Sequence, residues 1–551
     1  MIDEFKSLEE AVAGSALIKK SIAPRVVTPG NGRWFGSTAA QDLCGKKPPQ
    51  SDYVLFKDYI VLWYYHGVIG HKESLSLDER LTNGLGKLAD KTAAHSVCIK
   101  NITGNMCSSG LMGQLDYGAV FLVTVTIVVF MVPVFILFPP IPVDHSDALR
   151  QTHSKIGLQP HQSNLRSQYT AKHQPQPGKK PRIESLYIYP IKSCRGIELD
   201  RSKVLPTGLE HDRLYMLAQL KPQAISSGKQ AGHSSNSWEF LTLRQLPLMA
   251  NIKVDIWLPD PSKKSRQLGH LDGGFIVVRF PWQHQGLKGM VQLLAAKISR
   301  GLGAVPEKEF ILPLEFPSKK DIESRRYQFE DVKIWVDVTQ GLNMSRDLPP
   351  ELATYLGAKY RLGLFRADPS NRREVFRCAP PEETLGYQSV VDFQDAYPVH
   401  LLNLTSIRAL ESQIQKDERI QCLDACRFRG NILVSGAEPY DEDEWRTVQF
   451  KNPENCEDMS TFDVPCRTVR CKLPNVDPAT GIRHKLEPDH ALRKYRDIDE
   501  GAPKMGCLGM QLCPIFPNAS PSEQLNSYVE VGMDVDVIER GSHHYLKQSV
   551  S

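Results

Sequence analysis

The chain is poor in cysteine and has almost no net charge. Only 12 of its 551 residues are Cys, far fewer than a disulfide scaffold carries. Lys and Arg number 67 against 63 Asp and Glu, so the formal net charge is +4. No basic domain or stripe typical of nucleic-acid binding is evident. We therefore expect reduced thiols that act through reactivity or metal binding, and we expect no nucleic-acid partner.

The start of the chain lacks the apolar core of a secretory signal, and Asp3, Glu4 and Glu9 argue against a cleaved transit peptide. Internal repeats are absent as well. Hydrophobic residues make up 41% and charged residues 24%, close to the average of soluble globular proteins. These values exclude a disordered, fibrous or polytopic membrane protein. A usual domain size of about 150 residues then predicts three or four structural units.

Charge is missing altogether between residues 117 and 143. The run Gly118–Phe138 is almost purely apolar, and as a helix it would be about 30 Å long, the thickness of a bilayer core. A buried core helix is the alternative, but soluble helices that are apolar on every side are rare. We therefore predict one transmembrane helix over residues 117–143, which makes the lipid bilayer a partner.

The flanks of this run differ in charge. Between residues 144 and 182 there are seven Lys or Arg and two acids, whereas only Lys100 is basic in the 18 residues before the run. The positive-inside rule therefore places the C-terminal side in the cytosol. Residues 144–181 are rich in Gln, His, Ser and Pro, and we predict a flexible tether there. Residues 1–116 form an N-terminal region to which we assign no role.

Short strand-like runs recur beyond the predicted tether. They are Ser185–Ile191, Phe275–Phe280, Val332–Val338, Val399–Leu402, Asn431–Val434 and Tyr528–Ile538. Two helices are expected between them. One carries Leu287, Met290, Val291, Leu294 and Ile298 on one face and ends at Gly301; the other carries Ile407, Leu410 and Ile414, with Asn403 or Thr405 as its cap. Many strands and few helices predict a β-rich α+β fold with a barrel.

The segment from Val464 to Gly481 is the most informative for chemistry. Cys466 and Cys471 flank Arg467 and Arg470, and a thiol beside a guanidinium favours the thiolate, which is the nucleophile and the metal ligand. Both Cys could instead be small buried hydrophobes. A structural zinc site from Cys422, Cys426, Cys466 and Cys471 is a further alternative, although the spacings C-x3-C and C-x4-C differ from the usual C-x2-C.

Seven motifs along the chain follow the order of a known family. They are YPIKSCRG (Tyr189–Gly196), HDR (His211–Arg213), LTLRQ (Leu241–Gln245), FRGN (Phe428–Asn431), RCKLPNVDPATG (Arg470–Gly481), KLEPDHALRKYR (Lys485–Arg496) and VEVGMDVDV (Val529–Val537). In these motifs the region from Arg182 to Glu539 resembles the MOSC family, in the two-part arrangement of the mitochondrial amidoxime-reducing components. The resemblance implies a MOSC N-terminal β-barrel domain over residues 182–340 and a MOSC domain over residues 341–551.

The resemblance also implies a molybdenum cofactor, with Cys471 as the catalytic residue and metal ligand. Charged residues on the family's cofactor positions suit a phosphate and a pterin, because a phosphomonoester needs charge-assisted donors. The implied cofactor-binding residues are Lys192, Ser193, Arg213, Asp395, Ala396, Tyr397, Arg429, Arg470 and Gln511. The chain departs from the family pattern at Ala396 and Tyr397, where small hydroxyl residues are common, and at Gln511, which replaces an aromatic residue.

The activity implied by the resemblance is the two-electron reduction of small N-hydroxylated substrates such as amidoximes. The implied electron source is NADH, acting through NADH-cytochrome b5 reductase and cytochrome b5. The implied location is the outer mitochondrial membrane, which suits the predicted single span. A sulfur-carrier or cofactor-binding domain like that of molybdenum cofactor sulfurases is the alternative. A complete sulfurase would also need a pyridoxal-phosphate domain, and nothing before Arg182 is patterned for one.

Overall fold

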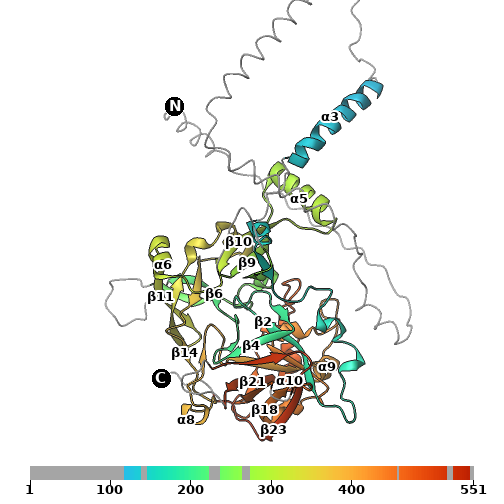
Figure 1. The fold of residues 1–551 in the computed structure, drawn as a ribbon. Helices are drawn as coiled ribbons and strands as arrows, with labels where there is room; N and C mark the ends of the chain where they lie inside the picture. The colour runs from blue at the N-terminus through green and yellow to red at the C-terminus, as the bar shows by residue number, and fades with distance from the viewer. Residues whose placement is uncertain are drawn as a thin grey trace, which may run out of the picture. The chain divides into compact units, whose positions relative to one another are not determined.

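The computed structural model describes residues 117–137, 145–222, 236–263, 273–455, 458–517 and 525–546. The expectations for residues 1–116 lie outside this part of the chain. Strands outnumber helices along the described residues, and short turns join most of them (Figure 1). The β-rich α+β class is confirmed.

Five strands form a closed barrel in the order β11–β12–β13–β6–β7. Met216, Trp238 and Phe365 are buried among the side chains that fill it. The barrel strands are β6 (Tyr215–Pro222), β7 (Asn236–Phe240), β11 (Gln328–Ile334), β12 (Asp337–Asn343) and β13 (Arg361–Ala367). A separate antiparallel sheet comprises β1 (His153–Lys155), β8 (Lys253–Pro259), β9 (Phe275–Pro281) and β10 (Glu307–Pro313). The predicted barrel is thus present.

Nine strands form the largest sheet. Its path runs β16–β17–β2–β23–β18–β19–β21–β20, with β3 paired to β2, and β21 also pairs with β16, so the path returns on itself. The strands are β2 (Arg182–Ile188), β3 (Ile197–Leu199), β16 (Val399–Asn403), β17 (Ile432–Ser435), β18 (Trp445–Lys451), β19 (Met459–Asp463), β20 (Arg467–Val469), β21 (Cys507–Ile515) and β23 (Asp534–Arg540). Trp445, Phe450 and Phe462 are fully buried in the core that this sheet encloses.

Shorter elements complete the described part. Five strands form two small sheets, which are β4 (Arg201–Leu205), β5 (Gly208–Leu209) and β22 (Ser527–Glu530), and β14 (Arg373–Glu374) with β15 (Val390–Val391). Short helices are α4 (His145–Leu149), α6 (Lys319–Arg325), α7 (Pro350–Leu356), α8 (Glu382–Leu385) and α10 (Asp489–Tyr495).

The two predicted domains share strands. β2 (Arg182–Ile188), from the start of the expected N-terminal domain, pairs with β17 and β23 of the large sheet. The boundary expected between residues 340 and 341 falls inside β12, and β13 beyond it pairs with β6 of the barrel. That boundary therefore cuts through the barrel, because hydrogen bonds between strands far apart in sequence leave no local signal.

A helix, α3 (Tyr117–Leu137), coincides with the uncharged run. Within the part of the chain that the structure describes, no helix combines the length and the apolar character needed to cross a membrane. The predicted helix is therefore present, whereas the predicted span is not confirmed. The remainder of the predicted span, residues 138–143, lies outside the described residues.

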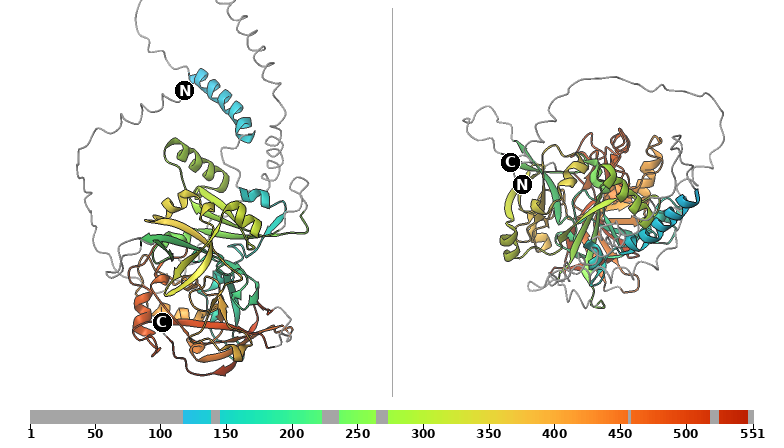
Figure 2. Two further views of the ribbon diagram at one scale, coloured as in Figure 1. Left: turned by 90° about the vertical axis from the view of Figure 1, so that its left-hand side faces the viewer. Right: turned by 90° about the horizontal axis from the view of Figure 1, so that it is seen from above.

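The other two predicted helices also form, but their apolar faces differ in environment. In α9 (Leu404–Ser412) the Asn403 side chain accepts a hydrogen bond from the Thr405 amide, as a cap does, and Ile407 and Leu410 are buried. In α5 (Gly286–Arg300) the predicted end at Gly301 is confirmed by its positive φ of 97°. The five apolar residues predicted on one face of α5 are exposed. The helix itself is drawn in Figures 1 and 2.

Two predicted strands are each interrupted by a turn. Val332–Val338 is a hairpin in which Ile334 of β11 faces Asp337 of β12, and Trp335 makes the turn with a φ of 58°. Tyr528–Ile538 is likewise divided between β22 and β23 around Gly532, whose φ is 94°. Left-handed backbone favours glycine, so Gly532 was a usable signal and Trp335 was not.

The predicted flexible tether is wrong for residues 145–181, which pack on the body. β1 pairs with β8, and His153 within it is fully buried, with its ring bonded to Thr152 and to the Gly273 carbonyl. Leu165 and His173 are buried too. The segment is polar, but its polar groups find partners on the body, and these contacts replace the missing apolar run.

Candidate functional site

One cavity of about 510 Å³ brings together all ten residues predicted for the site. They come from loops at strand ends: Lys192 and Ser193 after β2, Arg213 before β6, Asp395, Ala396 and Tyr397 before β16, Arg429 before β17, and Arg470 and Cys471 after β20, with Gln511 on β21. Loops carried by rigid strands are usual positions for functional residues. These residues lie in separate segments of the chain, and nothing in the sequence alone showed that they would meet in one cavity.

Lys192 is almost completely buried in the cavity wall. Its ammonium donates to the Phe393 carbonyl and to the Asp395 carboxylate, each at 2.7 Å. Burial lowers the pKa of Lys192 to about 8, although Asp395 opposes that shift. Desolvation would raise the pKa of Asp395, but the Lys192 ammonium and the Trp335 indole hold it below its usual range. The pair is therefore charged at neutral pH.

Arg213 and Arg429 both lie against the ring of Tyr189. The distances from the guanidinium carbons to the ring centroid are 4.6 and 4.0 Å. Arg213 donates to Asp212 and, at 3.1 Å, to Asn431. Arg429 donates to the Cys194 carbonyl at 2.8 Å. Its second terminal nitrogen is buried and has no hydrogen-bond partner among the described residues, so it remains available to a ligand.

Three of the predicted site residues have left-handed backbone. The φ angles of Ser193, Arg213 and Arg429 are 68°, 52° and 55°. Such conformations cost about 1–3 kcal/mol each for residues other than glycine and occur preferentially at functional sites. The fold thus holds these side chains at the cavity at the expense of local backbone strain.

Arg470 lies deep beside Cys471. It donates to the Phe428 carbonyl at 2.9 Å and meets His400 Nε2 at 3.3 Å. Burial lowers the pKa of Arg470 to about 10. Burial, with Arg470 nearby, holds the pKa of His400 far below its usual value, so His400 is neutral and its Nε2 can accept from Arg470.

The two thiols of this segment have different surroundings. Cys471 lines the cavity and is partly exposed. Cys466 is fully buried in a separate cluster with Cys378 and Cys513. Its hydrogen bond with Cys378, together with burial, raises the pKa of Cys466 far above the usual value. Only Cys471 is placed to reach a ligand in the cavity.

Besides the ten predicted residues, fourteen others line this cavity, including four that contact its charged groups. Arg244 lies 4.0 Å from the Trp335 ring, whose indole donates to Asp395 at 3.1 Å, and His400 and Asn431 hold the two arginines described above. Arg244 stands in the LTLRQ motif, which was a usable signal. Trp335 lay in a predicted strand, so nothing in the sequence placed it at a turn over the cavity.

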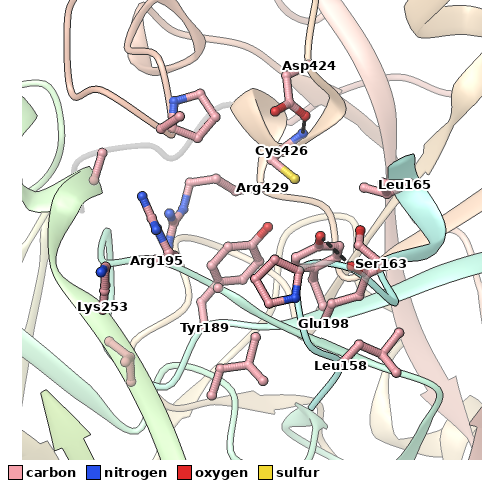
Figure 3. Close-up of a pocket in the computed structure, with 18 of the residues that line it drawn as sticks. Leu158, Ser163, Leu165, Tyr189, Arg195, Glu198, Lys253, Asp424, Cys426 and Arg429 are labelled. Carbon is pink, nitrogen blue, oxygen red and sulfur yellow. Dashed lines mark hydrogen bonds between the residues drawn. The ribbon is translucent and has the colours of Figure 1, made fainter. Parts of the chain in front are cut away.

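A larger cavity of about 710 Å³ lies nearby and shares Arg429 with the first (Figure 3). Figure 3 shows Tyr189, Arg195 and Arg429 on one side of it and Leu158, Leu165 and Glu198 on the other. Of the ten predicted residues only Arg429 lines it. Residues of the predicted tether, among them Leu158 and Leu165, form part of the wall of this larger cavity. The ten predicted site residues all line the smaller cavity.

The alternative zinc site does not form in the described part of the chain. No three or more His, Cys, Asp or Glu residues there are grouped to hold a metal ion. Cys426 lines the larger cavity, Cys471 the smaller one, and Cys466 neither. These three cysteines of that alternative are thus separated by the fold, and the fourth, Cys422, is disulfide-bonded, which corrects the expectation of reduced thiols at that position.

The smaller cavity fits an anionic cofactor. Seven cationic side chains and one carboxylate, Asp395, line it among the described residues. Arg429 and Arg470 donate to carbonyl oxygens or a neutral ring, so their buried charges lack the paired anion that buried charges normally require. A phosphate and sulfur ligands would supply that negative charge, and Cys471 adds the soft thiolate that a metal such as molybdenum binds.

Comparison with known families finds two matching segments. Residues 180–271 match the MOSC N-terminal beta barrel domain and residues 388–534 match the MOSC domain, so these two segments are similar to the two parts of MOSC-type proteins. Among curated relatives, it is 24% identical over 354 residues to mitochondrial amidoxime reducing component 2 of Rattus norvegicus, covering 63% of this chain and 80% of the relative.

Two further relatives extend the comparison. Mitochondrial amidoxime-reducing component 1 of Xenopus laevis is 29% identical over 323 residues, covering 58% of this chain and 72% of that protein. Molybdenum cofactor sulfurase of Arabidopsis thaliana is 23% identical over 325 residues, which are 57% of this chain but only 31% of the sulfurase. The chain is therefore similar both to amidoxime-reducing components and to a molybdenum cofactor sulfurase, the two groups that the sequence motifs suggested.

Proposed function

We propose that this protein is a molybdenum cofactor-dependent oxidoreductase that reduces N-hydroxylated compounds. The observation that carries the proposal is the smaller cavity, which is lined by seven cationic side chains and by Cys471. The likeness to amidoxime reducing components over 63% of the chain supports the same function.

Nine of the ten predicted residues have a role in this proposal. Lys192, Arg213 and Arg429 bind the phosphate and the pterin by charge-assisted hydrogen bonds, Ser193 adds a hydroxyl, and Arg470 holds negative charge beside the metal. Ala396, Tyr397 and Gln511 complete the wall. When bound through Cys471, the cofactor supplies the two-electron redox chemistry. The cationic wall orients the cofactor and excludes bulk water.

Electrons come, in this proposal, from NADH through its reductase and cytochrome b5. We place the protein at the outer mitochondrial membrane, held by residues 117–143, with the described MOSC part in the cytosol. The amidoxime-reducing relatives are named as mitochondrial proteins, which supports that location. The uncharged run supports the attachment to a membrane. Protease added to intact mitochondria should then remove the region after residue 143, and full protection of that region would contradict the orientation.

A sulfur-carrier or cofactor-binding domain remains the second candidate, because the chain also resembles the sulfurase of Arabidopsis thaliana. In that case Cys471 would carry sulfur, or the cavity would only store the cofactor. The two candidates predict different properties of the purified protein.

One experiment separates them. The full chain is purified, its molybdenum content is measured, and turnover of an amidoxime is followed with a chemical reductant that needs no cytochrome. Molybdenum with reduction supports the proposal. Molybdenum or a persulfide without reduction supports the second candidate, and zinc alone contradicts both. Adding cytochrome b5, its reductase and NADH then tests the electron source.

A further inference from the structure

Five of the six large apolar side chains of α5 are exposed, and the sixth, Leu293, is half-buried. Leu287, Met290, Val291, Leu294 and Ile298 are 51–80% exposed, whereas Ala295 and Ala296 on the other side are 5% and 3% exposed. A helix of a soluble domain normally buries its large apolar stripe. α5 buries Ala295 and Ala296 instead, which leaves an apolar face from Leu287 to Ile298 exposed.

The charges of α5 are of one sign. Gly286–Arg300 contains Lys288, Lys297 and Arg300 and no Asp or Glu. Lys288 and Lys297 are exposed, and Arg300 lies 3.6 Å from Glu307 at the start of β10. A helix with an apolar face and basic flanks is typical of the lipid interface, where the cations meet anionic headgroups.

The position of α5 in the fold agrees with such a surface. The chain enters the described body at α4 (His145–Leu149), where the Ser146 amide and hydroxyl donate to the Glu309 carboxylate at 2.8 and 2.9 Å. Glu309 stands two residues from Glu307, the partner of Arg300. α5 and the start of the body are therefore fixed to the same end of β10. The residues between Leu137 and His145 span at most about 28 Å, so α5 lies within a short reach of the end of α3.

We propose that α5 lies on the surface of a membrane that contains anionic lipids, with its apolar face among the acyl chains and its lysines at the headgroups. The inference rests on the membrane attachment in the proposed function and is independent of the cofactor chemistry. α5 is then a second point of contact besides α3. Two contacts fix the orientation of the body on the membrane, which a single flexible attachment would leave free.

The test uses the full chain reconstituted with vesicles whose acyl chains carry bromine, a contact quencher of tryptophan. Leu294→Trp adds one indole to the 7 Trp of the chain. The matched control is Leu486→Trp, because Leu486 is 64% exposed and Leu294 is 61% exposed. In anionic vesicles we expect the emission added at position 294 to shift to the blue and to fall by about half or more, as for an indole at the acyl boundary. The emission added at position 486 should be unchanged.

Charge reversal tests the lipid preference. Lys288→Glu with Lys297→Glu should reduce the quenching at position 294 in anionic vesicles to the level seen in zwitterionic ones. Equal quenching with and without these changes would overturn the part of the proposal that requires anionic lipids.

Other results would overturn the inference and identify another occupant. Vesicle binding without quenching at position 294 leaves the attachment through residues 117–143 intact and rejects a role for α5. A chain that does not float with vesicles rejects the attachment itself. Blue-shifted emission from position 294 without lipid means that another segment of this chain covers α5. A dimer in light scattering that Leu294→Gln abolishes means that a second copy does so.

Discussion

Cys466 with Arg467 and Cys471 with Arg470 form two similar pairs in one six-residue segment, yet the fold uses them differently. Cys466 is fully buried beside Cys378, and Arg467 contacts Asp499 at 3.4 Å and the His543 carbonyl at 3.0 Å. Cys471 lines the cavity, and Arg470 donates to a carbonyl oxygen and a neutral imidazole. Arg467 also lines the cavity, but it is paired with the protein's own Asp499, whereas Arg470 has capacity left for a ligand.

The difference follows from the strand that joins them. β20 (Arg467–Val469) pairs with β21 at the edge of the large sheet. Cys466 precedes this strand and packs into the core, whereas the strand itself and the following Arg470 and Cys471 line the cavity. Adjacent charge therefore does not distinguish the two thiols, whereas their positions relative to the strand do, because only Cys471 lines the cavity.

The largest effect is expected for Cys471→Ser. Loss of the soft thiolate, which a hydroxyl does not replace, should reduce amidoxime turnover to background, while the fold stays intact because Cys471 is not part of the core. Turnover with a chemical reductant and molybdenum content measure the effect. Cys466→Ser is the matched control and should keep most of the activity. Loss of activity in Cys466→Ser with activity retained in Cys471→Ser would show that Cys471 is not the metal ligand.

The next largest effect concerns the arginine of the buried pair. Arg467→Gln removes a partner of Asp499, whose side chain is 0% exposed. A buried charge that loses its partner destabilises a protein by about 3–5 kcal/mol. Denaturant unfolding measures the loss. A change smaller than that of an exposed arginine, such as Arg201→Gln, would show that Arg467 is not a structural residue.

Arg470→Gln should act on the cofactor instead. Because Arg470 makes no ion pair with a carboxylate among the described residues, its removal should cost little stability in the cofactor-free protein. We expect the affinity for the cofactor to fall by about 10–100-fold, the usual effect of losing a group beside a metal ligand. Cofactor retained after gel filtration measures this. Full retention would contradict the assignment of Arg470 to the cavity's anion.

The smallest effect is expected for the pH dependence of the Cys378 thiol, which is hydrogen-bonded to Cys466. The hydrogen bond from Cys466 lowers the pKa of Cys378 to about 6. The Cys378 thiolate stabilises the folded state above the unfolded pKa of about 9, and this contribution is lost as the pH falls through about 6. Alkylation of the Cys378 peptide should therefore rise with a midpoint of about pH 6. Cys466→Ala should move that midpoint upward, and an unmoved midpoint would contradict the hydrogen bond as its cause.

Local patterns predicted much of the scaffold. The strands β9, β16 and β17 and the helices α5 and α9 form close to where their apolar spacing and their caps place them, because these elements depend on neighbours in sequence. The hairpin at Trp335 escaped the same reasoning. A tryptophan is not a turn residue by preference, and here it takes a positive φ while its indole donates to Asp395. Such local conflicts are expected at functional sites.

Periodicity did not predict environment. α5 and α9 have the same kind of apolar face, but Ile407 of α9 is fully buried and Ile298 of α5 is 77% exposed. The same limit applies to residues 145–181, whose polar composition suggested a tether. His153 and His173 are buried there because distant groups, such as the Gly273 carbonyl and the amide of Gly436, complete their hydrogen bonds.

The sequence by itself determined the resemblance to the MOSC family and the β-rich fold class, through seven motifs in order, two thiols beside arginines, an uncharged run and many short strand-like segments. These features depend on residues that are close together in the sequence, so they can be recognised without the tertiary structure. Only the tertiary structure decided which thiol faces the cavity, that ten residues from six separate segments converge on it, and that α5 leaves its apolar face uncovered. Those outcomes depend on the pairing of strands such as β2 with β17, which are more than two hundred residues apart, and no local pattern encodes such a pairing.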